Sequence, residues 1–194
     1  MRLSELLEIE SGTLATRIDE HKGGKKYFLY ENEQFYSQYA SAIDMKNRKS
    51  IVTFANVKQI FSRDIVINLF KGECTIVRDE FDGNIINANF AKVSFLNKKI
   101  DRNYFVYWFN ESTASKKQLL QDIQGTVMKK ITIGKLKNME IELPAIDVQK
   151  TIGDLYIAQL RLNCLYDKKI KLKQLRTREM IRRYERGVEK DGQH

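Results

Sequence analysis

The sequence predicts an α+β fold, in which a mixed α/β domain precedes a long, projecting C-terminal helix that pairs with another helix in a dimer. Short β-branched runs fill the middle of the chain, and apolar residues recur every three or four positions toward its end. The single proline, Pro144, lies between these two patterns. We therefore expect a domain over residues 1–143, a helix over residues 144–186 and a flexible tail over residues 187–194.

The first thirty residues predict a short element followed by a basic loop. Leucines fall on one side of residues 1–10, which predicts a short helix or strand that ends at Ser11-Gly12-Thr13. Residues 21–30 join a flexible Gly23-Gly24 turn to lysines and tyrosines. We expect this segment to be an exposed basic and aromatic loop that leads into a strand.

The middle of the chain predicts a sheet. Short runs rich in β-branched residues occupy residues 50–57, 64–70 and 74–78. The turn signal Asp82-Gly83-Asn84 then precedes a further strand-like run over residues 85–96. A sheet-rich middle is therefore expected.

Two helices are expected to pack on this sheet, and Gly125 is expected to end the second. They are defined by apolar residues at helical spacing, namely Tyr104, Phe105, Trp108 and Phe109, followed by Leu119, Leu120 and Ile123. Beyond Gly125, apolar positions predict a last pair of strands, at Ile131, Ile133, Met139, Ile141 and Leu143.

The C-terminal pattern predicts one long helix. No proline occurs from Asp147 to Arg186, and at about 1.5 Å per residue these roughly 40 residues make a rod of about 60 Å. Because so long a helix cannot fold over a small domain, it must project, and another helix must cover its apolar stripe. The stripe, which we expect to form the dimer or partner interface, comprises Ile152, Leu155, Ala158, Leu162, Leu165, Leu172 and Leu175.

Pro144 marks the predicted boundary between domain and helix. It bars Leu143 from helical geometry, lacks the amide donor that would extend the strand, and leaves Asp147 free to cap the helix. Two residues interrupt the helical pattern, because Lys169 breaks the stripe and Gly153 costs about 1 kcal/mol inside a helix. Gly153 is either a local defect or a position where a partner backbone comes close.

The net charge indicates a polyanionic partner. The formal charge is +9 and the pI is about 9.4. Nucleic acid is favoured over membrane because no basic amphipathic segment has a bulky aromatic lipid face. Residues 145–194 hold 12 Lys/Arg against 7 Asp/Glu, whereas residues 1–144 hold 22 against 18, so the domain is only locally basic.

Localisation and metal binding are predicted from what the sequence lacks. It has neither an 18-residue apolar run nor a signal-peptide pattern, so we expect a cytoplasmic protein with no membrane partner. Cys74 and Cys164 have no second cysteine or histidine at metal-ligand spacing. We therefore expect neither a metal site nor a disulfide.

Known catalytic motifs are also missing, which predicts a non-catalytic protein. The sequence has no P-loop, no GxSxG motif and no histidine-based pair of base and nucleophile. Asp64 is followed by Glu73-Cys74-Thr75, which lacks the lysine of the nuclease D…ExK pattern. Residues 87–90, Asn-Ala-Asn-Phe, lack both prolines of the Asn-Pro-Pro-Phe loop of adenine methyltransferases. We therefore expect the chain to be a binding protein and not an enzyme.

Basic and aromatic residues that interleave along the domain predict contacts with DNA. Lysines attract phosphates, while arginine and asparagine side chains can read base edges with two hydrogen bonds. Taken singly, each could instead be a solvated surface charge or a turn asparagine. The candidate DNA-binding residues are Lys22, Lys25, Lys26, Tyr27, Lys46, Arg48, Lys49, Asn56, Lys71, Arg78, Asn84, Asn87 and Asn89.

The order of these features resembles that of the specificity subunit of type I restriction-modification systems, in which target-recognition domains alternate with long conserved helices. The similar stretches are residues 2–12, 63–73, 85–93, 99–110 and 124–152. In the last of them the family typically reads Ile-Pro-Leu-Pro-Pro-Leu, two acidic positions, glutamine and a hydrophobic turn. Matching places are occupied by Pro144, Ile146, Gln149 and Ile152. Ala145 and Val148 depart from the pattern.

The resemblance implies a half-length specificity subunit, with one target-recognition domain over residues 1–143 and one conserved-type helix. Such a subunit would be non-catalytic and would bind no cofactor, because the partner methyltransferase subunits bind S-adenosylmethionine. Its partners would be double-stranded DNA, a second copy of itself, methyltransferase subunits and possibly restriction subunits. An alternative interpretation is a protein-interaction or antirestriction decoy, whose helix pairs with a specificity or methyltransferase subunit without reading DNA.

Overall fold

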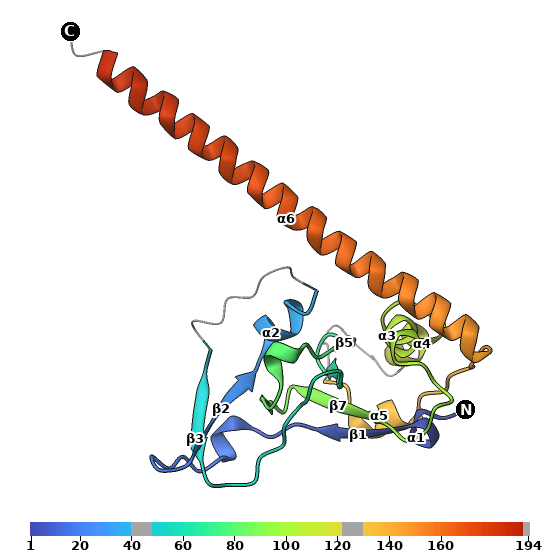
Figure 1. Cartoon of the computed structure of the whole chain (residues 1–194). Coiled ribbons are helices and arrows are strands. Elements are labelled where there is room, and N and C mark those ends of the chain that lie inside the picture. Colours follow the sequence, from blue (N-terminus) through green and yellow to red (C-terminus); the bar gives the residue numbers. More distant parts are fainter. Residues whose placement is uncertain (40–47, 122–129, 192–194) are drawn as a thin grey trace.

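The computed structural model describes residues 1–39, 48–121 and 130–191. Figure 1 shows a body of sheets and short helices, from which one long helix, α6, projects far beyond the rest of the chain. This arrangement confirms the predicted α+β class with a projecting C-terminal helix.

The larger sheet has four strands, and every neighbouring pair in it is antiparallel. Its order is β1 (Leu7–Ser11), β7 (Phe90–Phe95), β4 (Ile65–Asn68) and β5 (Glu73–Ile76). All four residues of β4 are buried, as expected for a central strand that is covered on both faces.

The smaller sheet has three strands and lies at the end of the body away from the start of α6 (Figure 1). Its order is β3 (Ser50–Thr53), β2 (Lys25–Tyr30) and β6 (Ile85–Ile86). Strand β2 pairs with β3 in antiparallel fashion and with β6 in parallel fashion. The helix α2 (Asn32–Tyr36) and the 3-10 turns η1 (Ala15–Arg17) and η2 (Asp79–Phe81) complete this side.

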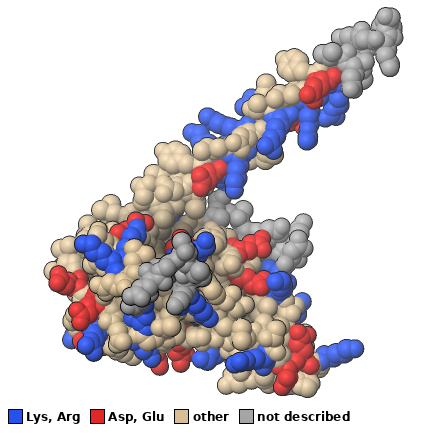
Figure 2. All heavy atoms as spheres, turned by 180° about the vertical axis from the view of Figure 1, so that it is seen from behind, with Lys and Arg blue, Asp and Glu red and all other residues tan. Residues whose placement is uncertain are grey.

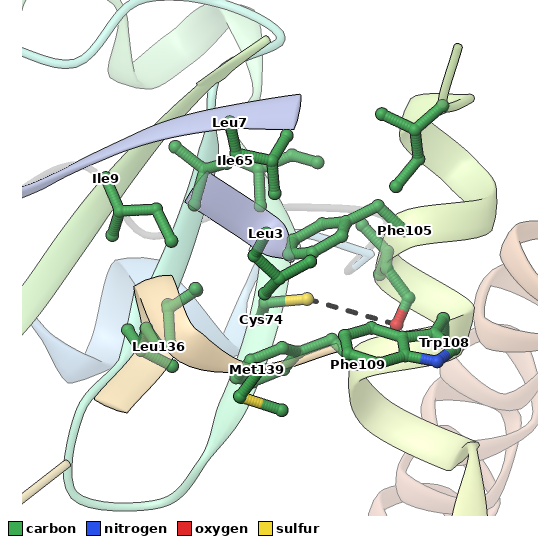
Figure 3. Packing of buried hydrophobic residues seen from close by; sticks show 14 of the residues in the cluster. Leu3, Leu7, Ile9, Ile65, Cys74, Phe105, Trp108, Phe109, Leu136 and Met139 are labelled. Atoms are coloured by element: carbon green, nitrogen blue, oxygen red, sulfur yellow. Dashed lines mark hydrogen bonds between the residues drawn. The ribbon is translucent and has the colours of Figure 1, made fainter. Parts of the chain in front are cut away.

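The main core lies between the larger sheet and four helices, α1 (Leu3–Leu6), α3 (Arg102–Glu111), α4 (Thr113–Leu120) and α5 (Ile133–Asn138). Figure 3 shows Phe105 and Phe109 of α3 pointing toward Leu3 and Cys74. The Cys74 thiol donates to the carbonyl of Val106 (3.9 Å). Both cysteines are free, and the described residues contain no cluster of three or more potential metal-ligating side chains.

The helix α6 spans Ile146–Asp191, which is 46 residues and therefore about 70 Å. Its first turns pack along α3, and from Leu165 to Arg186 every residue is exposed. Nowhere in the described ranges is a helix both long enough and apolar enough to cross a bilayer.

Several predictions of secondary structure needed correction. The predicted last pair of strands was wrong, because the helix α5 occupies this segment. The Thr132 hydroxyl caps α5 by accepting a hydrogen bond from the Lys135 amide (3.2 Å). The buried side chain of Leu136 packs α5 against the core. The run over residues 85–96 divides into β6 and β7. Asp147 does not cap α6 but lies in its first turn. The predicted helix end at Ile123 and Gly125 lies outside the described residues.

Candidate nucleic-acid interface

Basic and aromatic side chains share one face of β2, which is exposed at Lys26 and Phe28 and covered at Tyr30. We call the β3-β2-β6 sheet, with residues 17–24, 48–49 and 54–58 beside it, the small lobe. Side chains along a strand alternate between faces, and Tyr27 and Leu29 pack into the core of this lobe. Phe28 lies on the opposite face and is partly exposed, with the Lys26 ammonium 5.2 Å from its ring centre.

Arg48 lies over Phe28 on this face and is partly buried. Its guanidinium lies 4.4 Å from the ring centre of Phe28 and 5.4 Å from that of Phe81, which are favourable cation–π distances. The Nε and Nη2 atoms of Arg48 are buried and have no hydrogen-bond partner among the described residues. Burial lowers the pKa of this guanidinium. The neighbouring Lys49 forms an ion pair with Glu31 (3.0 Å).

Exposed polar residues gather at one end of the small lobe. Because Lys25 is paired with Thr53 in the antiparallel β2-β3 ladder, the chain entering β2 and the chain leaving β3 lie at the same end. Lys22 and Asn56 are exposed on these two segments. The structure thus brings together on the small lobe seven of the predicted DNA-binding residues, namely Lys22, Lys25, Lys26, Tyr27, Arg48, Lys49 and Asn56.

Two predicted basic residues lie elsewhere. Lys71 borders a cavity of about 820 Å³ between the β4-β5 turn, α4 and α6. Arg78 borders a groove between the body and α6, and it forms an ion pair with Glu80 (2.6 Å). Lys46 lies outside the described residues.

The predicted asparagines have mostly structural surroundings. Asn84 is buried, so its side chain cannot reach a base edge from this position. The side-chain oxygen of Asn87 accepts from the Asn89 amide (3.1 Å) and so shapes the turn between β6 and β7. Asn89 itself is exposed. We therefore leave Asn84 and Asn87 out of the proposed interface.

Sequence reasoning missed two aromatic residues of the small lobe, Phe28 and Phe54. Phe28 lies within the segment singled out as basic and aromatic, and its place two residues after Lys26 puts both on one face of a strand. Phe54 follows the last residue of β3 and is 74% exposed. The predicted strand run, residues 50–57, included Phe54, so nothing in the sequence marked it as an exposed residue beyond the strand.

A second surface is the apolar stripe of α6, which the structure leaves largely uncovered. Figure 2 shows that lysines and arginines also crowd the projecting part of this helix, whereas basic and acidic side chains are mixed on the visible face of the body. Ile152 is an exception within the predicted stripe, because it packs against the main core of the body. The exposed members are Leu155, Ala158, Leu162, Leu165, Leu172 and Leu175.

Gln149 joins the start of α6 to the body. Its side chain is buried and makes three hydrogen bonds: Oε1 accepts from the Asp101 amide (2.9 Å), and Nε2 donates to the carbonyls of Lys99 (3.0 Å) and Pro144 (2.8 Å). Asp101 in turn caps α3 by accepting from the Tyr104 amide (2.9 Å). One glutamine therefore links the first turns of two helices.

Gly153 lets the backbones of α6 and α3 come close. A Cβ atom at this position would lie 2.4 Å from the Tyr104 nitrogen and 2.6 Å from the Asn103 carbonyl carbon. Neither interpretation of Gly153 was right as stated, because a backbone does come close, but it is that of α3 in the same chain and not that of a partner. Farther along, Tyr156 donates to Glu111 (3.1 Å), and burial raises the pKa of its hydroxyl above the usual value.

Comparisons with solved structures support the same architecture. The HsdS subunit from Thermoanaerobacter tengcongensis has a TM-score of 0.56 and 17% identity, covering 88% of this chain and 39% of that one. The type I restriction-modification S subunit from M. genitalium has a TM-score of 0.56 and 16% identity, covering 92% and 43%. At these identities the likeness concerns the fold, and the chain spans about two-fifths of the length of these structures.

A third match, from a study of complex assembly and conformational transition of the type I R-M system, has a TM-score of 0.59 and 14% identity, covering 93% of this chain and 42% of that one. No curated protein matches the chain. A family model described as the type I restriction modification DNA specificity domain matches residues 1–172, most of the chain. The chain therefore belongs to this family of DNA specificity domains, which are non-catalytic.

Proposed function

We propose that this chain reads DNA sequence through the small lobe, dimerises through α6, and directs methyltransferase subunits of a type I restriction-modification system to a split DNA site. In this proposal residues 1–143 form the target-recognition domain and residues 144–186 form the dimerisation helix. The observation that carries it is the joint placement of Lys26 and Arg48 over the partly exposed ring of Phe28.

The small lobe offers the contacts that DNA binding requires. Lysines supply attraction to phosphates, which positions a protein on the duplex, while an arginine can donate two hydrogen bonds to a guanine. Arg48 is held against two rings and keeps buried donors without partners among the described residues.

Dimerisation is supported by the exposed apolar stripe of α6. Leu155, Leu162 and Leu165 are all more than two-fifths exposed, and a second helix would remove them from water. In an antiparallel pair the two domains lie at opposite ends of one rod. A two-fold dimer presents the same reading surface twice, so both half-sites must have the same sequence in opposite orientation.

The partners of this proposal are double-stranded DNA, a second copy of the chain, methyltransferase subunits and restriction subunits, in the cytoplasm. Any S-adenosylmethionine would be bound by the methyltransferase subunits. A second candidate is a decoy that pairs with a specificity or methyltransferase subunit without reading DNA. The exposed stripe of α6 is compatible with both, and the modest charge of residues 1–144 favours the decoy.

A gel-shift assay on random-sequence DNA, with and without a methyltransferase subunit, separates the two candidates. The reader should bind DNA, and replacing Lys25, Lys26 and Lys49 with glutamine should reduce the slope of log affinity against log salt by about 0.9 for each phosphate that the variant no longer binds. Three lysines of α6 serve as the matched control, in the variant Lys168→Gln/Lys171→Gln/Lys173→Gln. If only the control variant changed the slope, the DNA contacts would lie on α6 and not on the small lobe.

A further inference from the structure

Phe54 is an exposed aromatic residue at the tip of the small lobe. It follows β3 directly, and at 74% exposed it is the most exposed phenylalanine in the chain. Its ring has few neighbours: the His21 ring centre is 6.1 Å away, and a Cβ atom on Gly23 would only touch it, at 3.4 Å. Exposing so large an apolar side chain is unfavourable in water, and a binding partner that covered the ring would remove this cost.

The backbone that carries Phe54 is held firmly. Thr53 is buried, and its hydroxyl donates to the Asp19 carbonyl (2.7 Å) and accepts from the Ala55 amide (3.0 Å). These two bonds fix the chain on either side of Phe54. On the neighbouring segment, a Cβ on Gly24 would lie 2.4 Å from the Thr53 carbonyl carbon, so the two backbones touch. The ring therefore projects from a preorganised tip.

The charges around the ring favour a nucleic acid over an apolar protein surface. Lys22, Lys25 and Lys26 are exposed on the segment that lies beside Phe54, and Lys25 is paired with the residue that precedes it. An apolar protein partner would have to desolvate these ammonium groups as it covered the ring. Duplex DNA instead offers phosphates to the lysines and a stacked apolar interior to the ring.

We propose that Phe54 is a wedge that inserts between neighbouring base pairs of duplex DNA when the small lobe is bound. Insertion would partly unstack one base step and bend the duplex, and the lysines beside the ring would hold the flanking phosphates. Base steps that unstack easily would then be preferred beneath Phe54, which would make it a specificity-determining residue. This inference rests on the proposed DNA-reading function of the small lobe.

Direct contact can be measured with the variant Phe54→Trp, because the natural Trp108 is buried and contributes a constant signal. Adding duplex DNA, with the methyltransferase subunits present if they are needed for binding, should quench the new tryptophan. Quenching should be absent in Phe70→Trp, a matched control at an exposed phenylalanine on the β4-β5 turn. Equal fluorescence of Phe54→Trp with and without bound DNA would overturn the wedge.

The energetic test compares Phe54→Ala with Phe70→Ala. Loss of the wedge should weaken DNA binding by roughly 10-fold without changing the salt slope, since stacking involves no phosphate. The melting temperature should not change, because the ring is mostly exposed.

The outcomes of this test separate the wedge from the proposed function. If Phe54→Ala bound DNA normally while the lysine variant of the small lobe did not, the wedge would be wrong and the proposed function would stand. If neither variant affected binding, the proposed function would fail as well. A Phe54→Ala variant that lost only its binding to the methyltransferase would assign the ring to a protein contact and overturn the wedge.

Discussion

The two halves of α6 differ in what covers them. In the first half, one side is buried against the body through Gln149, Gly153 and Ile157, while Leu155, on another side, is 67% exposed. In the second half, from Leu165 to Arg186, every side chain is exposed. The body therefore covers one face of the first half of α6 and leaves the second half uncovered.

This difference shows where the second helix of the proposed dimer would pack. The helix is continuous, but a helix in a protein draws most of its stability from the packing of its apolar face, and an unpacked helix is only marginally stable in water. Exposed apolar residues occur along both halves, including Leu155, Leu162, Leu172 and Ile181. One face of α6 thus packs on its own domain, and the exposed apolar residues are where the proposed second helix would pack.

The largest expected effect concerns this second interface. Replacing Leu155 and Leu162 with lysine should weaken self-association by about 100-fold or more, because charged groups would then have to be buried between helices. The domain should stay folded, since both side chains face solvent in the single chain. Light scattering at micromolar concentration measures the change. A wild-type protein that was monomeric under these conditions would contradict the dimer.

The next effect concerns the completed interface at Gln149. The variant Gln149→Leu leaves the Asp101 amide and two carbonyls without their partner, which should cost roughly 2–3 kcal/mol of unfolding free energy. Gln159→Leu is the matched control on the same helix, because its side chain is exposed and, among the described residues, bonds to Asn163 alone (2.8 Å). Denaturant unfolding should separate the two variants, and equal stabilities would mean that Gln149 does not join α6 to the body.

A smaller effect is expected at Gly153. The variant Gly153→Ala forces α6 away from the α3 backbone and should lower the unfolding free energy by about 1–3 kcal/mol, partly offset by the better helix propensity of alanine. At Gly134 in α5, an added Cβ meets nothing within 4 Å, so Gly134→Ala should be neutral or stabilising by up to about 1 kcal/mol. Thermal melts of both variants test this, and a stabilised Gly153→Ala would contradict the close packing.

The sequence predicted α6 well because a long periodic pattern without proline permits few other structures. It could not predict which side of α6 the body covers: Ile152 was assigned to the exposed stripe, yet it packs on the core. The last strand pair failed because the alternating apolar residues of 131–143 read like strands, while Thr132 and Leu136 favour a short helix. Asn84 was chosen as an exposed turn residue, but burial depends on distant neighbours that spacing does not specify.

The most direct measurement of the central proposal is site selection from random DNA, because a dimeric reader with a rod between its domains must prefer a fixed spacer. An insertion of four residues near Lys169 adds about one turn and about 6 Å to α6. At about 3.4 Å per base pair, the selected spacer should grow by one or two base pairs while the inverted half-sites stay the same. Selection would use the wild-type and inserted proteins, in complex with the methyltransferase if required. Identical spacers would contradict the role of α6 in setting the separation, and one contiguous asymmetric site would contradict the dimeric reader itself.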